Sequence, residues 1–341
     1  MRENGFETTA AVPLPFGFTA GAARRLVRRY IYKPYAGLSQ ENREGICRAA
    51  EVGDADAVKA FYALGVGLET RGHGRMTPLL AAAKGGSAEC MELLLGLGAD
   101  RCACAPGGAT LLMVAAGSAS AACVQLALAA GADVNARSAT GDTPLGSAAA
   151  VGAAGCMQLL LAAGADVNAR SASGDTPLGT AAAVGAAGCM QLLLAAGADV
   201  EAQDVDGGFP LLNSALRGHE DCVRMLLAAG ADVHACNPAG RNALMAAACG
   251  GSAGCVEILL AAGADADAVT RHRVSPLMLA ARSGSAACVR LLLAAGADAC
   301  VRDKKWRCAL DRVSLHGDHA EIVALLTEAA RKKFEKMQML P

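Results

Sequence analysis

Apolar and polar positions in this chain follow a pattern that repeats every 33 residues. The tripeptide Gly-Ala-Asp marks the pattern and returns seven times without a slip in register, at 98–100, 131–133, 164–166, 197–199, 230–232, 263–265 and 296–298. A Thr-Pro pair or its equivalent keeps the same spacing, so repeats begin at residues 44, 77, 110, 143, 176, 209, 242, 275 and 308. A fixed period of this length indicates an array of stacked supersecondary units.

One repeat, residues 77–109, predicts two helices and a turn. Pro78 suits the first turn of a helix and Gly86 ends it. The apolar face of this first helix consists of Leu79, Ala82 and Ala83. A second helix ends at Gly98, which can adopt positive φ, and its expected buried stripe consists of Cys90, Met91, Leu93, Leu94 and Leu95. The turn residues that follow predict a projecting finger before the next repeat.

These repeats resemble those of the ankyrin family. The resemblance rests on Thr143-Pro144-Leu145, Ala149-Ala150, Gly152, Leu159-Leu160-Leu161 and Gly164-Ala165-Asp166-Val167-Asn168-Ala169. It implies an all-α ankyrin-repeat solenoid of eight to nine helix-turn-helix units with projecting β-turn fingers, covering residues 44–330. Residues 1–43 are then a basic, aromatic N-terminal extension with a short amphipathic helix, and residues 331–341 are a basic C-terminal tail.

The charge is divided unevenly along the chain. The whole chain carries a net charge of -1, but residues 1–43 carry +4 and residues 331–341 carry +3, which leaves -8 for residues 44–330. A long nucleic-acid groove needs clustered Lys and Arg, so we expect no nucleic-acid partner. Hydrophobic residues make up 53% of the chain and aromatic residues only 3%, so the core must consist of small side chains on closely spaced helices.

The repeated cysteines and aspartates have structural interpretations. Seven of the fourteen cysteines, namely Cys90, Cys123, Cys156, Cys189, Cys222, Cys255 and Cys288, occupy one position of the second helix. Stacked helices about 8–10 Å apart are too distant for disulfides, so we expect small buried hydrophobes. The aspartate of each Gly-Ala-Asp should accept N–H groups of its own turn. Metal ligation is not expected, because the Cys102, Cys104 pair and the His234, Cys236 pair lack a second pair beside them.

The sequence argues against both a catalytic function and a membrane-spanning segment. There is no Gly-x-x-x-x-Gly-Lys-Ser/Thr loop and no His-Glu-x-x-His helix, and we predict no catalytic residue and no cofactor. The windows 143–165 and 176–198 are uncharged, but each contains a proline and several glycines. Equivalent positions in another repeat are charged, so a soluble repeat is favoured over a membrane span.

The last two fingers carry the candidate binding residues. The turn glycine of the earlier fingers is replaced by Arg273 and then by Trp306. The candidate partner-binding residues are Arg271, His272, Arg273, Lys304, Lys305 and Trp306, together with Arg137 and Arg170 on earlier fingers. Trp and Arg are enriched at protein interfaces, which favours a recognition patch for an acidic protein segment. The alternative is that Trp306 packs over the C-terminal end of the stack.

Two neighbouring repeats look like a recent duplication. Repeats 131–163 and 164–196 are identical at 31 of 33 positions and differ only at Thr140/Ser173 and Ser147/Thr180. A second copy of the same surface adds length without new side-chain chemistry. We therefore expect these repeats to act as a spacer and stiffener.

The N-terminal extension predicts a basic amphipathic helix from Ala22 to Lys33, ended by Pro34. One half of the helical wheel carries Arg24, Arg25, Arg28, Arg29 and Lys33, and the other carries Leu26, Val27, Tyr30 and Ile31. The helix either binds an anionic membrane surface or caps the first repeat. A transit signal is weakened by Glu3 and Glu7.

The function expected from the resemblance is a non-enzymatic scaffold or adaptor. It would bind a protein partner through the concave helix faces and the finger tips, as a monomer in the cytoplasm, the nucleus or at a membrane periphery. One alternative is a membrane-anchored adaptor that uses residues 22–33. Another is a substrate receptor of a ubiquitin ligase. Such a receptor would need a docking motif after the repeats, and residues 331–341 are short for one.

Overall fold

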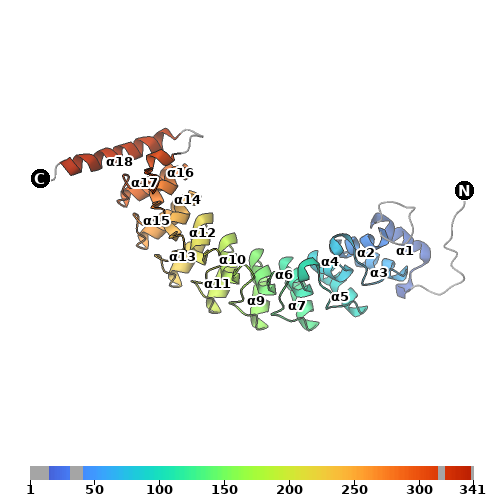
Figure 1. Cartoon of the computed structure of the whole chain (residues 1–341). Helices are drawn as coiled ribbons and strands as arrows, with labels where there is room; N and C mark the ends of the chain where they lie inside the picture. Colours follow the sequence, from blue (N-terminus) through green and yellow to red (C-terminus); the bar gives the residue numbers. More distant parts are fainter. Residues whose placement is uncertain (1–14, 31–40, 314–318, 339–341) are drawn as a thin grey trace, which may run out of the picture. The chain divides into compact units, whose positions relative to one another are not determined.

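The computed structural model describes residues 15–30, 41–313 and 319–338. Within them the chain forms eighteen α-helices and no strand. The chain divides into an N-terminal unit of residues 1–148 and 162–165 and a C-terminal unit of residues 149–161 and 166–341. From α2 to α17 the helices come in consecutive pairs, one pair per repeat, which confirms the all-α array that the period predicts (Figure 1).

The N-terminal unit contains two rows of helices. Its elements are η1 (Pro15–Gly17), α1 (Ala20–Val27), η2 (Arg28–Tyr30), α2 (Glu41–Val52), α3 (Ala55–Ala63), η3 (His73–Arg75), α4 (Pro78–Lys84), α5 (Ala88–Gly96), η4 (Pro106–Gly108), α6 (Leu111–Gly117), α7 (Ala121–Ala129) and most of α8 (Pro144–Ala150). The first helices α2, α4 and α6 pack side by side, and so do the second helices α3, α5 and α7. Helix α1 packs on α3.

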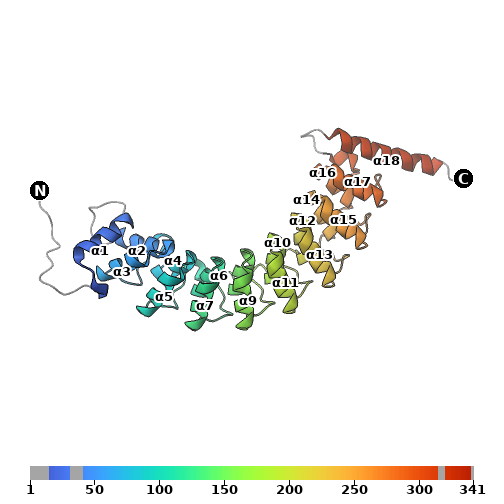
Figure 2. The same cartoon turned by 180° about the vertical axis from the view of Figure 1, so that it is seen from behind.

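The C-terminal unit, taken by itself, also contains two rows of helices. Its elements are most of α9 (Ala154–Ala162), α10 (Pro177–Val184), α11 (Ala187–Ala195), α12 (Pro210–Arg217), α13 (Glu220–Ala228), α14 (Ala243–Gly250), α15 (Ala253–Ala261), α16 (Pro276–Ser283), α17 (Ala286–Ala294), η5 (Leu310–Arg312) and α18 (Ala320–Gln338). Seen from either side, α10, α12, α14 and α16 form one row of this unit and α11, α13, α15 and α17 the other (Figures 1 and 2).

Repeat 77–109 shows why the helices form where they do. The Thr77 hydroxyl accepts the Leu80 N–H at 3.4 Å and caps α4, and the Ser87 hydroxyl accepts the Cys90 N–H at 3.3 Å and caps α5. Helix α4 is buried on nearly all sides because it lies between α2, α5 and α6.

The buried stripe of α5 is narrower than the sequence predicts. Cys90, Met91 and Leu94 are buried, whereas Leu93 and Leu95 are only half-buried. A helix has 3.6 residues per turn, so a run of consecutive apolar residues cannot all face the same neighbours.

The aspartate of every Gly-Ala-Asp accepts an N–H from the residue two positions later, as the sequence predicts. The acceptors are Asp100, Asp133, Asp166, Asp199, Asp232, Asp265 and Asp298, at 2.8–3.0 Å. These carboxylates fix the start of each finger.

The last second helix is longer than the others. In α17 the chain leaves the helix at Gly296, whose φ is +91°, but α18 has Ala329 at the equivalent position and continues to Gln338. This continuation places the Lys333 ammonium on the Asp298 carboxylate of the preceding repeat. Residues on both sides of the expected boundary at 330 and 331 therefore lie in one helix.

Candidate protein-binding surface

Eight finger tips share one backbone hairpin of five residues. The tips are 72–76, 105–109, 138–142, 171–175, 204–208, 237–241, 270–274 and 303–307. In each tip the first residue donates its N–H to the fifth carbonyl, at 2.8–3.0 Å, and the fourth residue donates to the first carbonyl, at 2.8–3.1 Å. Neighbouring tips are joined by further backbone bonds, such as Lys304 N–H to the His272 carbonyl at 3.1 Å.

The fourth residue of every tip adopts the left-handed conformation. It is glycine in five tips, namely Gly108, Gly141, Gly174, Gly207 and Gly240, with φ between +74° and +79°. The other three tips place Arg75, Arg273 and Trp306 there, with φ of +57°, +57° and +61°. A left-handed backbone is costly for residues with a Cβ. The hairpin therefore holds three large side chains at positions where glycine would fit with less strain.

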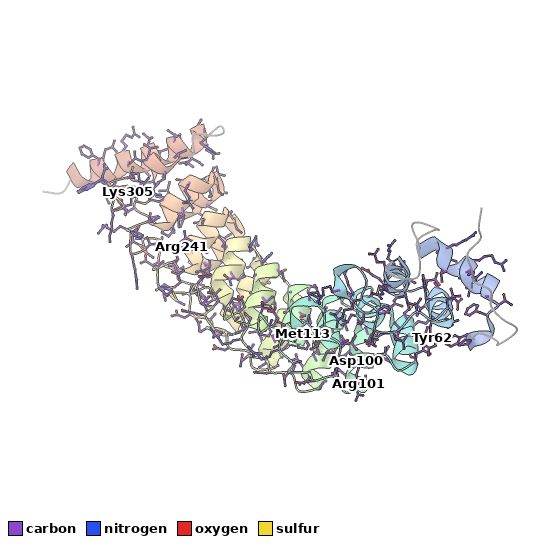
Figure 3. The ribbon with its side chains drawn as sticks, turned by 45° about the vertical axis from the view of Figure 1, so that its right-hand side comes forward. Tyr62, Asp100, Arg101, Met113, Arg241 and Lys305 are labelled. Atoms are coloured by element: carbon purple, nitrogen blue, oxygen red, sulfur yellow. The ribbon has the colours of Figure 1, made fainter. Side chains whose placement is uncertain are left out.

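The tips 270–274 and 303–307 expose a patch of cationic and aromatic groups. This C-terminal tip patch consists of Arg271, His272, Arg273, Lys304, Lys305 and Trp306, and all six side chains are exposed. Trp306 is 77% exposed, so it does not pack over the end of the stack. Lys305 is labelled in Figure 3. The patch combines several donors with one broad apolar surface.

Asp303 supports the last tip from below. Its side chain is 3% exposed and accepts the N–H groups of Lys305 and Arg307, at 2.7 and 3.0 Å. The guanidinium groups of Arg307 and Arg312 also bind it. Burial opposes ionisation of Asp303, but these donors outweigh that effect and hold its pKa well below the usual value. The hairpin that presents Trp306 is thus fixed by hydrogen bonds and ion pairs to the buried Asp303 carboxylate.

Arg170, an expected partner-binding residue, has a role within the array. Its guanidinium donates to the Gln203 carbonyl of the next finger, and the side chain remains exposed. Arg137 is exposed at the equivalent position of the preceding repeat. Neither residue belongs to the C-terminal tip patch.

The N-terminal helix covers part of the first repeat. Ala23 and Val27 of α1 are buried, and α1 packs on α3. Phe16 lies beside Tyr62 of α3, with 6.3 Å between the ring centroids, and Tyr62 is labelled in Figure 3. Arg24, Arg25, Arg28 and Arg29 are exposed, and Arg29 pairs with Asp54 at 3.1 Å. Helix α1 ends at Val27 and a 3-10 turn follows to Tyr30, while the expected member Lys33 lies outside the described residues.

Comparison with known proteins agrees with this geometry. A family model described as ankyrin repeats (3 copies) matches residues 46–138, 112–204, 211–303 and 255–337. The chain belongs to the ankyrin-repeat family. Among solved structures, it is similar to the human ASB11 ankyrin repeat domain, with 29% identity and a TM-score of 0.59 over 63% of this chain and 96% of that chain. No curated protein sequence matches.

Ankyrin repeats are generally not catalytic, although one short segment of this chain matches a catalytic sequence pattern. Residues 250–254 match the Gly-x-Ser-x-Gly pattern of hydrolase elbows. Here the serine follows helix α14 instead of a strand. The Ser252 hydroxyl accepts the Cys255 N–H at 3.3 Å and caps α15, as Ser87 caps α5. The pattern therefore has a helix-capping role.

The cysteines of the ankyrin array are free thiols. The seven that share one helix position are all buried. Where a shift is resolved, at Cys90, Cys123, Cys189, Cys222, Cys255 and Cys288, burial raises the pKa. Burial also raises the pKa of Cys47 to about 11. Raised thiol pKa values fit packing residues better than nucleophiles. Within the described residues there is no cluster of three metal-ligating side chains.

Two features of the site are not apparent from the sequence motifs. Asp303 occupies a turn position where Ser, Thr, Asn or Asp stands in the five preceding tips, so its burial and its two arginine partners emerge only in the structure. Arg75 stands two residues before Thr77-Pro78, as Arg273 stands two residues before Ser275-Pro276. That spacing is the signal that would have identified the first tip.

No helix among the described residues combines the length and apolar content needed to cross a membrane.

Proposed function

We propose that this ankyrin-repeat protein is a scaffold that binds an acidic segment of a protein partner through the C-terminal tip patch. The observation that carries the proposal is the exposure of Trp306 at a strained backbone position, in one of two neighbouring cationic tips. The helix faces of the array would supply a wider, less selective contact surface.

The chemistry of the patch supports an acidic partner. Arg271, His272, Lys304 and Lys305 are exposed, and no described residue forms a hydrogen bond or ion pair with their side chains. An incoming carboxylate would therefore meet donors that no internal partner occupies. Trp and Arg are the residues most enriched in binding hot spots, and a preformed hairpin limits the ordering cost on binding.

The proposal can be tested with a tip-exchange variant, in which the exposed residues of the two cationic tips are replaced by those of another tip, so that the hairpin backbone is preserved. The duplicated tip 171–175 has Ala, Ser and Gly at its second, third and fourth positions. The variant copies them as Arg271→Ala, His272→Ser, Arg273→Gly, Lys304→Ala, Lys305→Ser and Trp306→Gly. Binding of a fluorescein-labelled oligoglutamate peptide, followed by anisotropy at low salt, should weaken by about tenfold or more. Wild-type binding should also weaken as salt rises.

The matched control changes another tip of the same unit. Val205→Ala and Asp206→Ser alter tip 204–208, which carries no cation, and binding should stay unchanged. Equal affinity of the tip-exchange variant and wild type would overturn the proposal. Thermal unfolding of both variants shows whether the array remains folded.

The structure favours a capping role for the N-terminal helix over membrane binding. Its residues Ala23 and Val27, which a membrane would have to receive, are buried against the first repeat. Deletion of residues 1–36 would uncover α3, so charge variants are the better test. Arg24→Gln, Arg25→Gln and Arg28→Gln should not change sedimentation with anionic liposomes; a large loss would restore the membrane alternative.

A further inference from the structure

The first two finger tips border an open hollow in the N-terminal unit. Its lining residues are Arg71, Arg75, Cys104, Ala105 and Pro106, and its volume is about 320 Å³. We refer to it as the N-terminal tip hollow. Nothing in the motifs or in the family resemblance points to it.

Arg71 fixes the floor of the hollow. One of its terminal nitrogens donates to the Arg75 carbonyl at 2.9 Å and to the Cys104 carbonyl at 3.2 Å, so it links tip 72–76 to the residue that precedes tip 105–109. A guanidinium carries five N–H donors, and the remaining ones stay exposed with the side chain. These two bonds fix the guanidinium before any ligand arrives.

Arg75 supplies a second guanidinium at a strained backbone position. Its φ is +57° where five other tips have glycine, and its side chain is exposed. No hydrogen bond or ion pair within the described residues involves its guanidinium. These tips differ from the later ones, since Gly72 and Ala105 have no side-chain oxygen with which to support the turn.

Two carboxylates of the same two fingers accept backbone N–H groups. Glu69 accepts the Asp100 N–H at 2.8 Å, and Asp100 accepts the Cys102 N–H at 2.8 Å. Neither arginine of the hollow has an ion-pair partner among the described residues. Two guanidinium groups over a small polar hollow suit a carboxylate, which arginine binds in a bidentate manner.

We propose that the N-terminal tip hollow is a second binding site of the scaffold, and that it takes a carboxylate side chain from an acidic protein segment. The described residues that line the hollow include no aromatic side chain on which a nucleobase could stack. This lining disfavours a nucleic-acid strand. The site extends the proposed function to the N-terminal unit and is independent of the C-terminal tip patch.

Cys104 provides a readout inside the hollow. Its thiol is half-buried and lines the hollow, whereas Cys236 is exposed on a finger of the C-terminal unit. Alkylation of the full-length protein by iodoacetamide can be followed at each cysteine by mass spectrometry. Saturating oligoglutamate should slow alkylation of Cys104 by about tenfold and leave Cys236 unchanged.

Arg75→Gly is the matched variant, because it restores the residue that five other tips carry and therefore should fold. It should abolish the protection of Cys104, while Arg273→Gly at the equivalent position of the other unit should leave the protection intact. Arg75→Lys keeps the charge but loses the bidentate fork, so partial protection is expected.

Three outcomes would overturn the inference: no protection of Cys104 in wild type, equal protection in Arg75→Gly, or stronger protection by oligothymidylate of matched charge. The last would assign the hollow to single-stranded nucleic acid. Because the readout is local, loss of oligoglutamate binding at the C-terminal tip patch would leave this result unaffected.

Discussion

Tips 171–175 and 303–307 of the C-terminal unit have the same hairpin backbone and different chemistry. In both, the first residue donates its N–H to the fifth carbonyl at 2.9 Å. In the first tip the polar side chains bind one another, since the Ser173 hydroxyl contacts both Ser171 and Asp175. In the second, the Asp303 carboxylate takes the internal bonds and leaves Lys304, Lys305 and Trp306 exposed.

The comparison distinguishes the residues that stabilise the hairpin of a tip from those whose side chains are available for binding. The first position supplies the oxygen that supports the turn, and the fifth closes the backbone pair. The second and third positions carry different side chains on the same backbone, whereas the fourth must be left-handed and, at Gly174, has the next tip close to it. A duplicated tip can therefore remain a spacer while the last tip acquires cations and Trp306 on the same backbone.

The largest effect on stability is expected when the support of the last tip is neutralised. Asp303→Asn keeps an oxygen for the turn N–H groups but leaves Arg307 and Arg312 without an anion, so the melting temperature should fall by several degrees. The pKa of Asp303 is depressed in the fold. Its stabilisation is therefore present above the unfolded pKa of about 4 and is lost as pH falls further.

Thermal unfolding at neutral and acidic pH checks this expectation. Asp175→Asn in the spacer tip is the matched control and should show little change. An equal loss of stability in both variants would mean that the two tips are supported in the same way.

A graft in the opposite direction should destabilise the spacer tip. Ala172→Lys, Ser173→Lys and Gly174→Trp copy the last tip onto the duplicated one. A Cβ at Gly174 would lie 3.1 Å from the Val205 nitrogen and 3.2 Å from the Asp204 Cα, and its φ is +79°. We expect a loss of about 1–3 kcal/mol in chemical denaturation, with a gain in oligoglutamate binding. Unchanged binding would show that the side chains alone do not make the patch.

Arg170 separates a supporting role from a binding role. Arg170→Met removes the bond from its guanidinium to the Gln203 carbonyl and should cost about 0.5–1.5 kcal/mol of unfolding free energy. Oligoglutamate affinity, measured by anisotropy, should remain within error of wild type. A loss of affinity with full stability would return Arg170 to the binding residues.

The smallest effect on stability is expected at the tip itself. Trp306→Gly removes a side chain that is 77% exposed and releases a φ of +61°. Unfolding free energy should stay equal or rise by up to about 1 kcal/mol, whereas oligoglutamate binding should weaken. A marked destabilisation would mean that Trp306 has a structural role.

Most of the fold was predictable because the period and the helix signals agree. Gly-Ala-Asp at a constant spacing gives the repeats, and Pro78 and Gly86 mark the start and the end of the first helix in repeat 77–109. The stripe of α5 was predicted too wide, since the sequence does not show which side of Leu93 and Leu95 the neighbouring helices cover.

The candidate site was predictable only in part. Basic residues around Trp306 are visible in the sequence, but the same reasoning placed Arg170 with them although its guanidinium binds the next finger. Arg75 was missed because Cys104, which lines the same hollow, lies on another finger. Contacts between fingers depend on how the repeats stack, because stacking brings together residues that are about one repeat apart in the sequence.

By itself the sequence determined the repeat, the helices and the turn residues, because these depend on local propensity and on a period that recurs many times. The tertiary structure decided which charged side chains form bonds within the array and which remain exposed and available to a partner. Asp303 lies buried against two arginines while Trp306, three residues later, lies in solvent. That distinction depends on burial and hydrogen-bond partners, which a linear pattern does not contain.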